Sequence, residues 1–222
     1  MTHIDRGTID YKDELVRKLI HITSLSIPII YYFITKAVAL VILGSLTGFA
    51  IILDLSRYFS PQIGNVFYKI FGFLLRRHEV DEQKKNLNGA TYVLLSATLG
   101  VLIFPKVVFI TAFSILIIGD TMAALIGRKY GRHKFMAKSF EGTLAFFISS
   151  CIVVLFTPKI GYFSEEYFIG FFAAIVGAIT ENISFGYIDD NFSIPLVVGF
   201  TMWVLYLIFL PNIDLTLSFV PG

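Results

Sequence analysis

Charged residues and cysteine are both scarce in this 222-residue chain. Charged side chains make up 15% of the residues, against roughly 25% in an ordinary soluble domain. Hydrophobic residues make up 56% and the mean hydropathy is +0.76, so there is too little polar side chain to cover the surface of a soluble fold. The composition indicates a protein whose main solvent is the lipid bilayer.

Several classes of site are missing from the sequence. The single cysteine, Cys151, excludes an intramolecular disulfide, and the four histidines form no Cys/His cluster of the kind that binds zinc or an iron-sulfur centre. No G-x-x-x-x-G-K-[ST] motif occurs, so the common nucleotide-binding loop is absent. The net charge of +2 is too small to indicate a nucleic-acid partner, and we expect none.

Apolar runs dominate what is present. A helix needs about 20 apolar residues to cross the hydrocarbon core, and seven runs approach that length alone or with their flanks: Leu19–Ile34, Ala37–Leu55, Ala90–Phe104, Val107–Ile126, Thr143–Phe156, Tyr167–Ile183 and Ile194–Leu210. The 13 residues of Ile63–Leu75 would extend only about 20 Å as a helix, so we expect this segment to lie at the membrane interface. The sequence therefore predicts an all-α polytopic membrane helix bundle, with about seven transmembrane helices plus one interfacial helix, in a single domain over residues 1–222.

The basic residues between these runs fall mainly on one side of the predicted membrane. Segments 1–18, 56–89 and 127–142 hold all of the 18 Lys and Arg residues except Lys36, Lys106 and Lys159. Loops rich in Lys and Arg face the cytoplasm under the positive-inside rule. We therefore expect a multi-pass protein whose amino terminus and polar motifs are cytoplasmic.

Asp120 is unusual because it lies six residues inside the end of an apolar run, about 9 Å deep at the rise of a helix. A carboxylate at mid-span costs on the order of 3 kcal/mol on insertion scales. A divalent cation carrying substrate phosphates, a neighbouring Lys or Arg, or a water-filled cavity would each offset that cost. We expect Asp120 to belong to a functional site, with a structural ion pair as the alternative.

Small and basic residues surround and follow Asp120. Gly119, Ala123 and Gly127 recur every four residues, which makes a smooth helix face for a phosphate or for another helix. The loop after them carries five cations in eleven residues and leads to Ser139, where the next helix is predicted to begin. Cations and a helix N-terminus favour phosphate binding, although clustered Lys and Arg beside a span also bind anionic lipid headgroups.

Further polar groups are predicted on the same side. One face of the amino-terminal helix carries an acid, two cations and a histidine that can titrate near neutral pH, unless they only pair with one another: Glu14, Arg17, Lys18 and His21. Near the ends of the sixth and seventh spans lie carboxylates, which are the hard oxygen ligands that magnesium prefers: Glu181, Asp189 and Asp190. A plain helix cap is the alternative role for Asp189. Asn88 starts the third span, where we expect a turn and a cap.

The order of these motifs resembles the polyprenol (dolichol) kinase, phytol kinase and CTP-dependent diacylglycerol kinase family. The block from Gly119 to Thr143 is the most specific part of the resemblance, which runs over nearly the whole chain. The matching motifs, in order, are E-x-x-R-K-x-x-H from Glu14, N-G-A-T-Y from Asn88, G-D-x-x-A-x-x-x-G-x-x-x-G from Gly119, K-S-x-E-G-[ST] from Lys138, and E-N…D-D-N-x-x-I-P from Glu181.

The resemblance implies an enzyme that transfers the terminal phosphate of a nucleotide, often CTP, to the hydroxyl of a lipid alcohol with the help of Mg²⁺ or another divalent cation. Its partners would be the nucleotide, the lipid alcohol and the membrane lipids. Residues expected to act in catalysis are Asp120, Lys138 and His21. Residues expected to bind the metal are Asp120 and Asp190, supported by Glu181 and Asp189. Residues expected to bind the nucleotide are Arg17, Lys18, Asn88, Gly127, Arg128, Lys129, Gly131, Lys134, Ser139 and Glu141.

Two other functions compete with this hypothesis. A phosphatidate cytidylyltransferase, which makes CDP-diacylglycerol, would carry a long basic signature with paired glycines after a histidine and a terminal D-R-x-D, and neither occurs here. A small transporter or lipid-binding protein would place polar groups at many depths, whereas these motifs gather on one side. The sequence does not distinguish an isoprenoid alcohol from diacylglycerol as the lipid substrate, because an aliphatic tail requires only apolar helix faces.

Overall fold

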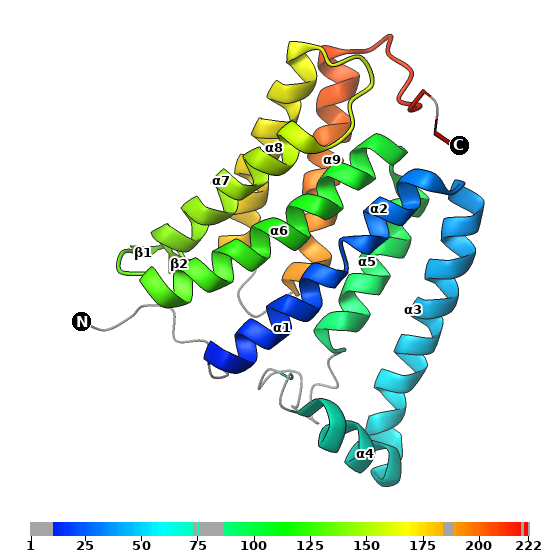
Figure 1. The fold of residues 1–222 in the computed structure, drawn as a ribbon, viewed down its shortest axis with the longest axis vertical. Helices are drawn as coiled ribbons and strands as arrows, with labels where there is room; N and C mark the ends of the chain where they lie inside the picture. The colour runs from blue at the N-terminus through cyan, green and yellow to red at the C-terminus, as the bar shows by residue number, and fades with distance from the viewer. Residues whose placement is uncertain (1–10, 73–74, 76–86, 184–188, 219, 222) are drawn as a thin grey trace.

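The computed structural model describes residues 11–72, 75, 87–183, 189–218, 220 and 221, and most of them are helical. One short antiparallel hairpin interrupts the helices, formed by β1 (Lys134–Phe135) and β2 (Lys138–Ser139). The helices are α1 (Tyr11–Thr23), α2 (Ser26–Phe33), α3 (Lys36–Phe59), α4 (Pro61–Phe71), α5 (Gly89–Ile103), α6 (Lys106–Tyr130), α7 (Phe140–Phe156), α8 (Ser164–Ile183) and α9 (Asp190–Phe209). We call the end of the bundle that carries β1 and β2 the hairpin end, and the other the opposite end (Figure 1).

The long helices run up and down between these two ends. Figure 1 shows α1 with α2, then α3, α5, α6, α7, α8 and α9 passing along the bundle, while α4 lies across the end of α3. Among the described residues, α3, α6, α8 and α9 are long and apolar enough to cross a membrane, and α5 and α7 are shorter apolar helices. The predicted all-α polytopic membrane bundle is confirmed. The expected interfacial segment begins two residues early, at Pro61, and its residues 73 and 74 lie outside the described part.

The first apolar run is broken into two helices rather than one. At the break, the N–H of Ser24 donates to the carbonyl of His21 at 2.9 Å, and the N–H of Leu25 donates to that of Ile22 at 3.0 Å, which is the tighter 3₁₀ spacing. Pro28 explains the break, because it has no N–H to donate to the carbonyl of Ser24. That carbonyl accepts from Ile27 instead.

Helix α6 is the centre of the bundle. All of its side chains from Val107 to Ile117 are buried, and it packs against α1, α2, α5, α7, α8 and α9. A helix that is apolar on every side is typical of a protein core or of a membrane span. Because α6 is central, it carries Asp120 into the interior near the hairpin end. Helix α3, by contrast, turns large apolar side chains such as Phe49 outward.

The helices α6 and α7 approach closely along the small-residue face that contains Gly119. A Cβ atom on Gly119 would lie 2.8 Å from the ring of Phe146. One on Gly142 would lie 3.1 Å from the carbonyl of Ala123 and 3.2 Å from the Cα of Gly127. The repeated small residues therefore serve helix packing, which is one of the two roles that their spacing allows.

Gly119→Ala is expected to destabilise the fold by about 1–3 kcal/mol, because the added methyl group overpacks against Phe146. Gly44→Ala is the matched control, since nothing lies within 4 Å of a Cβ at Gly44. Both substitutions exchange glycine for alanine inside a helix, so the difference between them isolates the contact. Thermal unfolding in one detergent measures it, and equal midpoints for the two variants would contradict the packing described here.

Lysines at the opposite end bond to the carbonyls that helix ends leave free. Lys36 Nζ donates to the carbonyl of Leu102 at 2.9 Å, and Lys106 Nζ donates to that of Ile34 at 2.8 Å. Lys159 likewise donates to the carbonyl of Val154 near the end of α7, at 2.6 Å. These three lysines are the ones that lie outside the basic segments of the sequence, and each donates to a carbonyl at the C-terminal end of a helix.

Candidate active site

Three carboxylates from three helices meet inside the hairpin end. Asp120 on α6, Glu181 near the end of α8 and Asp190 at the start of α9 each place a carboxylate oxygen within 4.8 Å of the other two. Asp120 and Glu181 are buried, and Asp190 is partly buried. Helices α8 and α9 pack against each other, and both pack on α6. The structure thus brings together Asp120 and Asp190, which are 70 residues apart in the sequence.

Cationic side chains surround these carboxylates. Lys138 Nζ donates to Glu181 Oε1 at 2.7 Å and to Asp190 Oδ2 at 3.0 Å. The buried Lys18 of α1 donates to Asp120 Oδ2, and His21 Nε2 lies 3.5 Å from the same oxygen. Burial lowers the pKa of Lys138, but the carboxylates of Asp190 and Glu181 raise it, and the net direction is above the usual lysine value. Lys138 therefore stays charged.

The carboxylate group has the chemistry of a divalent-cation site. Glu181 Oε2 and Asp190 Oδ1 are buried, and neither has a hydrogen-bond partner among the residues that the structure describes. Buried oxygens without partners are costly, and a hard cation such as Mg²⁺ satisfies them. Three carboxylates also exceed the two lysines bonded to them by one negative charge. The residues present fit a divalent cation.

Asn182 fixes the hairpin that carries Lys138. Its Oδ1 accepts from the N–H of Ala137 at 2.8 Å and from that of Lys138 at 3.2 Å, and its Nδ2 donates to Thr143 Oγ1 at 2.6 Å. Asn182 is fully buried, so these bonds form where water does not compete. The amide therefore ties the hairpin to α7 and α8 and positions Lys138.

Some of the residues that are predicted to bind the nucleotide make contacts that determine the shape of the hairpin loop itself. The carboxylate of Glu141 accepts from the N–H groups of Arg132 at 3.1 Å and His133 at 3.3 Å. Ser139 is buried and caps α7, with its Oγ accepting from the N–H of Gly142 at 3.3 Å. A Cβ on Gly131 would lie 2.8 Å from Ser139 Oγ, so glycine is needed for this close approach.

The predicted phosphate-binding cations fall into two groups. Arg17 and Arg128 both contact the buried carboxylate of Glu14, at 2.7 Å and 3.2 Å, which links α1 to α6. Lys129 and Lys134 are exposed to solvent at the hairpin end. The structure therefore gives Arg17 and Arg128 an ion-pair partner and leaves Lys129 and Lys134 on the surface.

Two other predicted residues lie outside the three-carboxylate group. Asp189 Oδ1 accepts from the N–H of Asn191 at 2.9 Å, which is the helix-cap role kept as an alternative for it. Asn88 Oδ1 accepts from the N–H of Thr91 at 2.9 Å, so Asn88 caps α5 as expected. Its own N–H donates to Asp54 Oδ2 at 2.6 Å.

Asp54 belongs to a buried ion pair that the sequence analysis missed. Arg57 Nε lies 3.1 Å from Asp54 Oδ1, both side chains are almost fully buried, and the guanidinium lies 4.9 Å from the centre of the Phe67 ring of α4. An acid and a base three residues apart at the end of an apolar run are the sequence signal for such a pair. The pair holds α3, α4 and the start of α5 together.

The fold and this site define an integral membrane helix bundle with a buried acid and lysine cluster at one end. An uncharacterised protein of Rickettsia prowazekii is 31% identical over 194 residues, covering 85% of this chain and 93% of that protein. The probable chloroplastic phytol kinase 2 of Glycine max is 30% identical over 174 residues, covering 71% and 58%. The CTP-dependent diacylglycerol kinase 1 of Saccharomyces cerevisiae is 28% identical over 173 residues, covering 68% and 58%.

The chain belongs to the membrane lipid kinase family that includes the phytol kinases and the CTP-dependent diacylglycerol kinases. It spans 58% of the length of each of the two kinases compared above. No protein-family model matches the chain, and no solved structure matches it.

Proposed function

We propose that this protein transfers the terminal phosphate of CTP to the hydroxyl of a lipid alcohol at the cluster of Asp120, Glu181 and Asp190. Phosphoryl transfer to an alcohol is the reaction class of its named relatives. The observation that carries the proposal is the meeting of three carboxylates within 4.8 Å, with two lysines bonded to them. Phosphoryl transfer needs this kind of positioning and charge neutralisation more than covalent chemistry from the protein.

In this proposal Asp120, Glu181 and Asp190 hold a divalent cation, which neutralises charge on the phosphates when it is bound. Asp189 supports the site from its position beside Asp190. Lys138 already touches two of the carboxylates, and its charged ammonium stabilises negative charge on the transferred phosphoryl group. Lys18 plays the same part beside Asp120.

The remaining predicted residues bind the rest of the nucleotide and the acceptor. Residues that hold phosphates or shape their loop are Arg17, Asn88, Gly127, Arg128, Lys129, Gly131, Lys134, Ser139 and Glu141. His21 Nε2 accepts the proton of the lipid hydroxyl as the hydroxyl oxygen bonds to phosphorus and the bond to the leaving nucleoside diphosphate breaks. The closeness of His21 to Asp120 Oδ2, at 3.5 Å, supports this role, because a carboxylate stabilises the imidazolium that forms.

We place the amino terminus and this site on the cytoplasmic side. In the sequence, segments 1–18, 56–89 and 127–142 hold all Lys and Arg residues except Lys36, Lys106 and Lys159. The described parts of these segments lie at the hairpin end, and the positive-inside rule assigns such basic segments to the cytoplasmic face. Cytoplasmic nucleotide would then reach the site directly. Labelling of single introduced cysteines by an impermeant reagent in sealed vesicles, in a Cys151→Ser background, tests the orientation, and labelling at Lys12→Cys only from the outer side would overturn it.

The products of the reaction test the proposed function. The purified full chain is incubated in nanodiscs with CTP and Mg²⁺ against phytol, a polyprenol and dioleoylglycerol, and the products are identified by mass. A phosphorylated alcohol together with CDP is the expected result. A CDP-lipid together with pyrophosphate would show the cytidylyltransferase reaction instead, and the absence of any product with every acceptor would contradict the proposal.

Removal of divalent cations is expected to abolish the transfer. Excess EDTA should reduce the rate below detection, and Mg²⁺ should restore it. Asp190→Asn should raise the Mg²⁺ concentration needed for half-maximal rate by about tenfold or more, because it replaces a charged carboxylate ligand with a neutral amide. Glu165→Gln, an exposed carboxylate change at the opposite end, is the control. An unchanged Mg²⁺ dependence in Asp190→Asn would count against the metal site.

A further inference from the structure

A cavity of about 400 Å³ lies beside the carboxylate cluster, between α1, α3 and α5. Most of its wall is apolar, and its polar side chains come from α1, from the end of α3, from Asn88 just before α5 and from Asn191 of α9. Residues that line it include Ile20, Ile27, Leu46, Phe49, Val93 and Leu94 on the apolar side, and Arg17, His21, Asp54, Asn88 and Asn191 on the polar side. Its volume is that of a small-ligand site, for which roughly 300–1,000 Å³ is usual.

Helices α1 and α3 each give the cavity one continuous face. On α3 the lining residues are Leu46, Phe49, Ala50, Leu53 and Asp54, and on α1 they are Arg17, Ile20 and His21, followed by Ser24. Residues three, four and seven apart share one side of a helix. From Leu46 to Leu53 the α3 face extends for about 10 Å at 1.5 Å per residue. The cavity is therefore an elongated groove that follows the bundle axis.

The groove joins the reaction centre to the membrane. At its polar end the groove is lined by His21, whose Nε2 lies 3.5 Å from Asp120 Oδ2, so one lining residue links the groove to the carboxylate cluster. Along its apolar part, Leu46, Phe49 and Ile20 are about half exposed or more on the outside of the bundle, where lipid chains lie. A molecule that enters from the bilayer thus meets apolar walls first and polar groups last.

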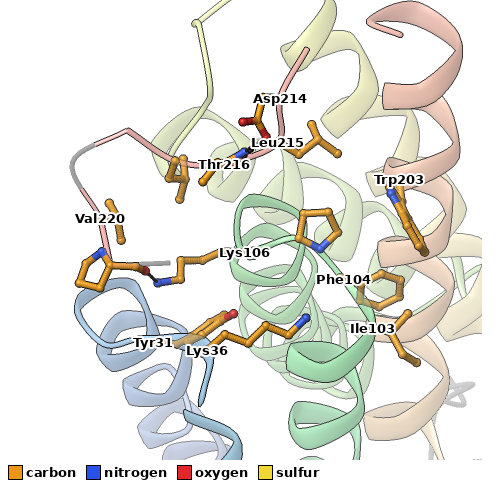
Figure 2. A pocket seen from close by; sticks show the side chains of 13 residues that line it. Tyr31, Lys36, Ile103, Phe104, Lys106, Trp203, Asp214, Leu215, Thr216 and Val220 are labelled. Carbon is orange, nitrogen blue, oxygen red and sulfur yellow. Dashed lines mark hydrogen bonds between the residues drawn. The ribbon is translucent and has the colours of Figure 1, made fainter. Parts of the chain in front are cut away.

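The cavity at the opposite end lacks this arrangement. It has about 380 Å³ and is lined by Tyr31, Lys36, Lys106, Trp203 and Asp214, among others (Figure 2). Both lysines donate to backbone carbonyls, and His21 does not line this cavity. Of these two cavities, only the groove beside His21 combines apolar walls with access to the proposed catalytic group.

We propose that the groove between α1, α3 and α5 binds the hydroxyl-bearing end of a lipid alcohol with a single hydrocarbon chain. This inference rests on the proposed function, since it supplies the acceptor of that reaction. The hydroxyl lies at His21, and the chain runs along the α3 face past Ala50 toward Leu46 and out into the bilayer. One groove accommodates one chain, so a lipid with two acyl chains would leave its second chain outside the groove.

A substitution that fills the groove tests the inference. Ala50→Phe is expected to lower kcat/KM for phytol by about tenfold or more, because the added ring takes the space of several methylene groups. The KM for CTP should not change. Ile52→Phe is the matched control, because Ile52 is on the same helix, does not line the groove and is 70% exposed. Equal kinetics for phytol in the wild type and both variants would overturn the inference.

Photolabelling gives a second measurement that does not depend on turnover. The full chain in nanodiscs is labelled with a long-chain primary alcohol that carries a diazirine, and the labelled peptides are mapped. Label is expected on the α3 face from Leu46 to Leu53 and near Ile20, and it should be lost in Ala50→Phe but not in Ile52→Phe. Excess phytol should displace it. Displacement by dioleoylglycerol at the same concentration, or label only on outward surfaces, would contradict a single-chain groove.

The two measurements separate the inference from the function on which it rests. If the wild type forms no phosphorylated product but Ala50→Phe still abolishes labelling, the groove binds a single-chain alcohol and the proposed function is wrong. If the wild type phosphorylates phytol and Ala50→Phe changes neither turnover nor labelling, the function stands and the groove is not the acceptor site.

Discussion

Replacing Asp120 with Asn is expected to slow phosphate transfer by about 10²- to 10³-fold. Asp120 is the point where the carboxylate cluster meets Lys18 and His21, so the substitution weakens both the metal site and the site of proton removal. Single-turnover transfer of labelled phosphate from CTP to phytol measures the effect. Glu165→Gln, which removes an exposed charge at the opposite end, should leave the rate unchanged.

A second variant separates catalysis from folding at this position. Asp120→Asn leaves Lys18 buried without its carboxylate, which is expected to cost about 3–5 kcal/mol of stability. Lys18→Met combined with Asp120→Asn removes the uncompensated charge and should recover much of that stability. The double variant should still transfer phosphate at least about 10²-fold more slowly than the wild type. A double variant that folds like the wild type and transfers phosphate at the wild-type rate would disprove the role given to Asp120.

Lys138→Met is expected to raise the KM for CTP at least about tenfold and to lower kcat by about 10²-fold, because Lys138 neutralises charge on the transferred group. Its ammonium is held by Glu181 and Asp190 next to the proposed metal. Lys12→Met, an exposed cation change on α1, is the control. Lys138→Arg should retain more activity than Lys138→Met, since it keeps the charge.

Stability must be measured on the same Lys138 variants. Loss of Lys138 leaves two carboxylates facing each other, so some destabilisation is expected. The proposal requires that the loss of transfer be much larger than the loss of folded protein, with the unfolding midpoint compared at one Mg²⁺ concentration. A loss of activity that follows the loss of folded protein in proportion would show that Lys138 serves the structure alone.

Much of the fold was predictable because the free energy of transferring a helix into the bilayer depends on the amino-acid composition of that helix. The apolar runs predict the ends of the membrane-crossing helices within a few residues. Only the first run differs, since it predicts one helix where the structure has two, α1 and α2. Its break at Ser24 depends on a single missing N–H group, that of Pro28, which the average hydropathy of a run does not report. The start of the helix at Pro61, two residues early, follows likewise from the preference of proline for the first helical turn.

The candidate site was predicted less completely, because its contacts depend on how the helices are rotated. Motif order and loop charge placed Asp120, Lys138 and Asp190 on one side of the membrane, and the structure adds that they share a cluster. The bond between Lys18 and Asp120 joins residues 102 positions apart, and no local pattern specifies it. Asn182 follows Glu181 in the E-N motif, and nothing local to that motif predicts that its amide holds the hairpin.

Lys36 and Lys106 at the opposite end tie together two parts of the chain that are made at different times. The first residue of α3 donates to the end of α5, and the first residue of α6 donates to the end of α2. During synthesis, Lys36 and the carbonyl of Ile34 therefore have no partner in the chain until the segment that carries Leu102 and Lys106 has left the ribosome. The first four passes consequently lock as one unit, and a truncation before Lys106 should leave the earlier passes inserted but loosely paired.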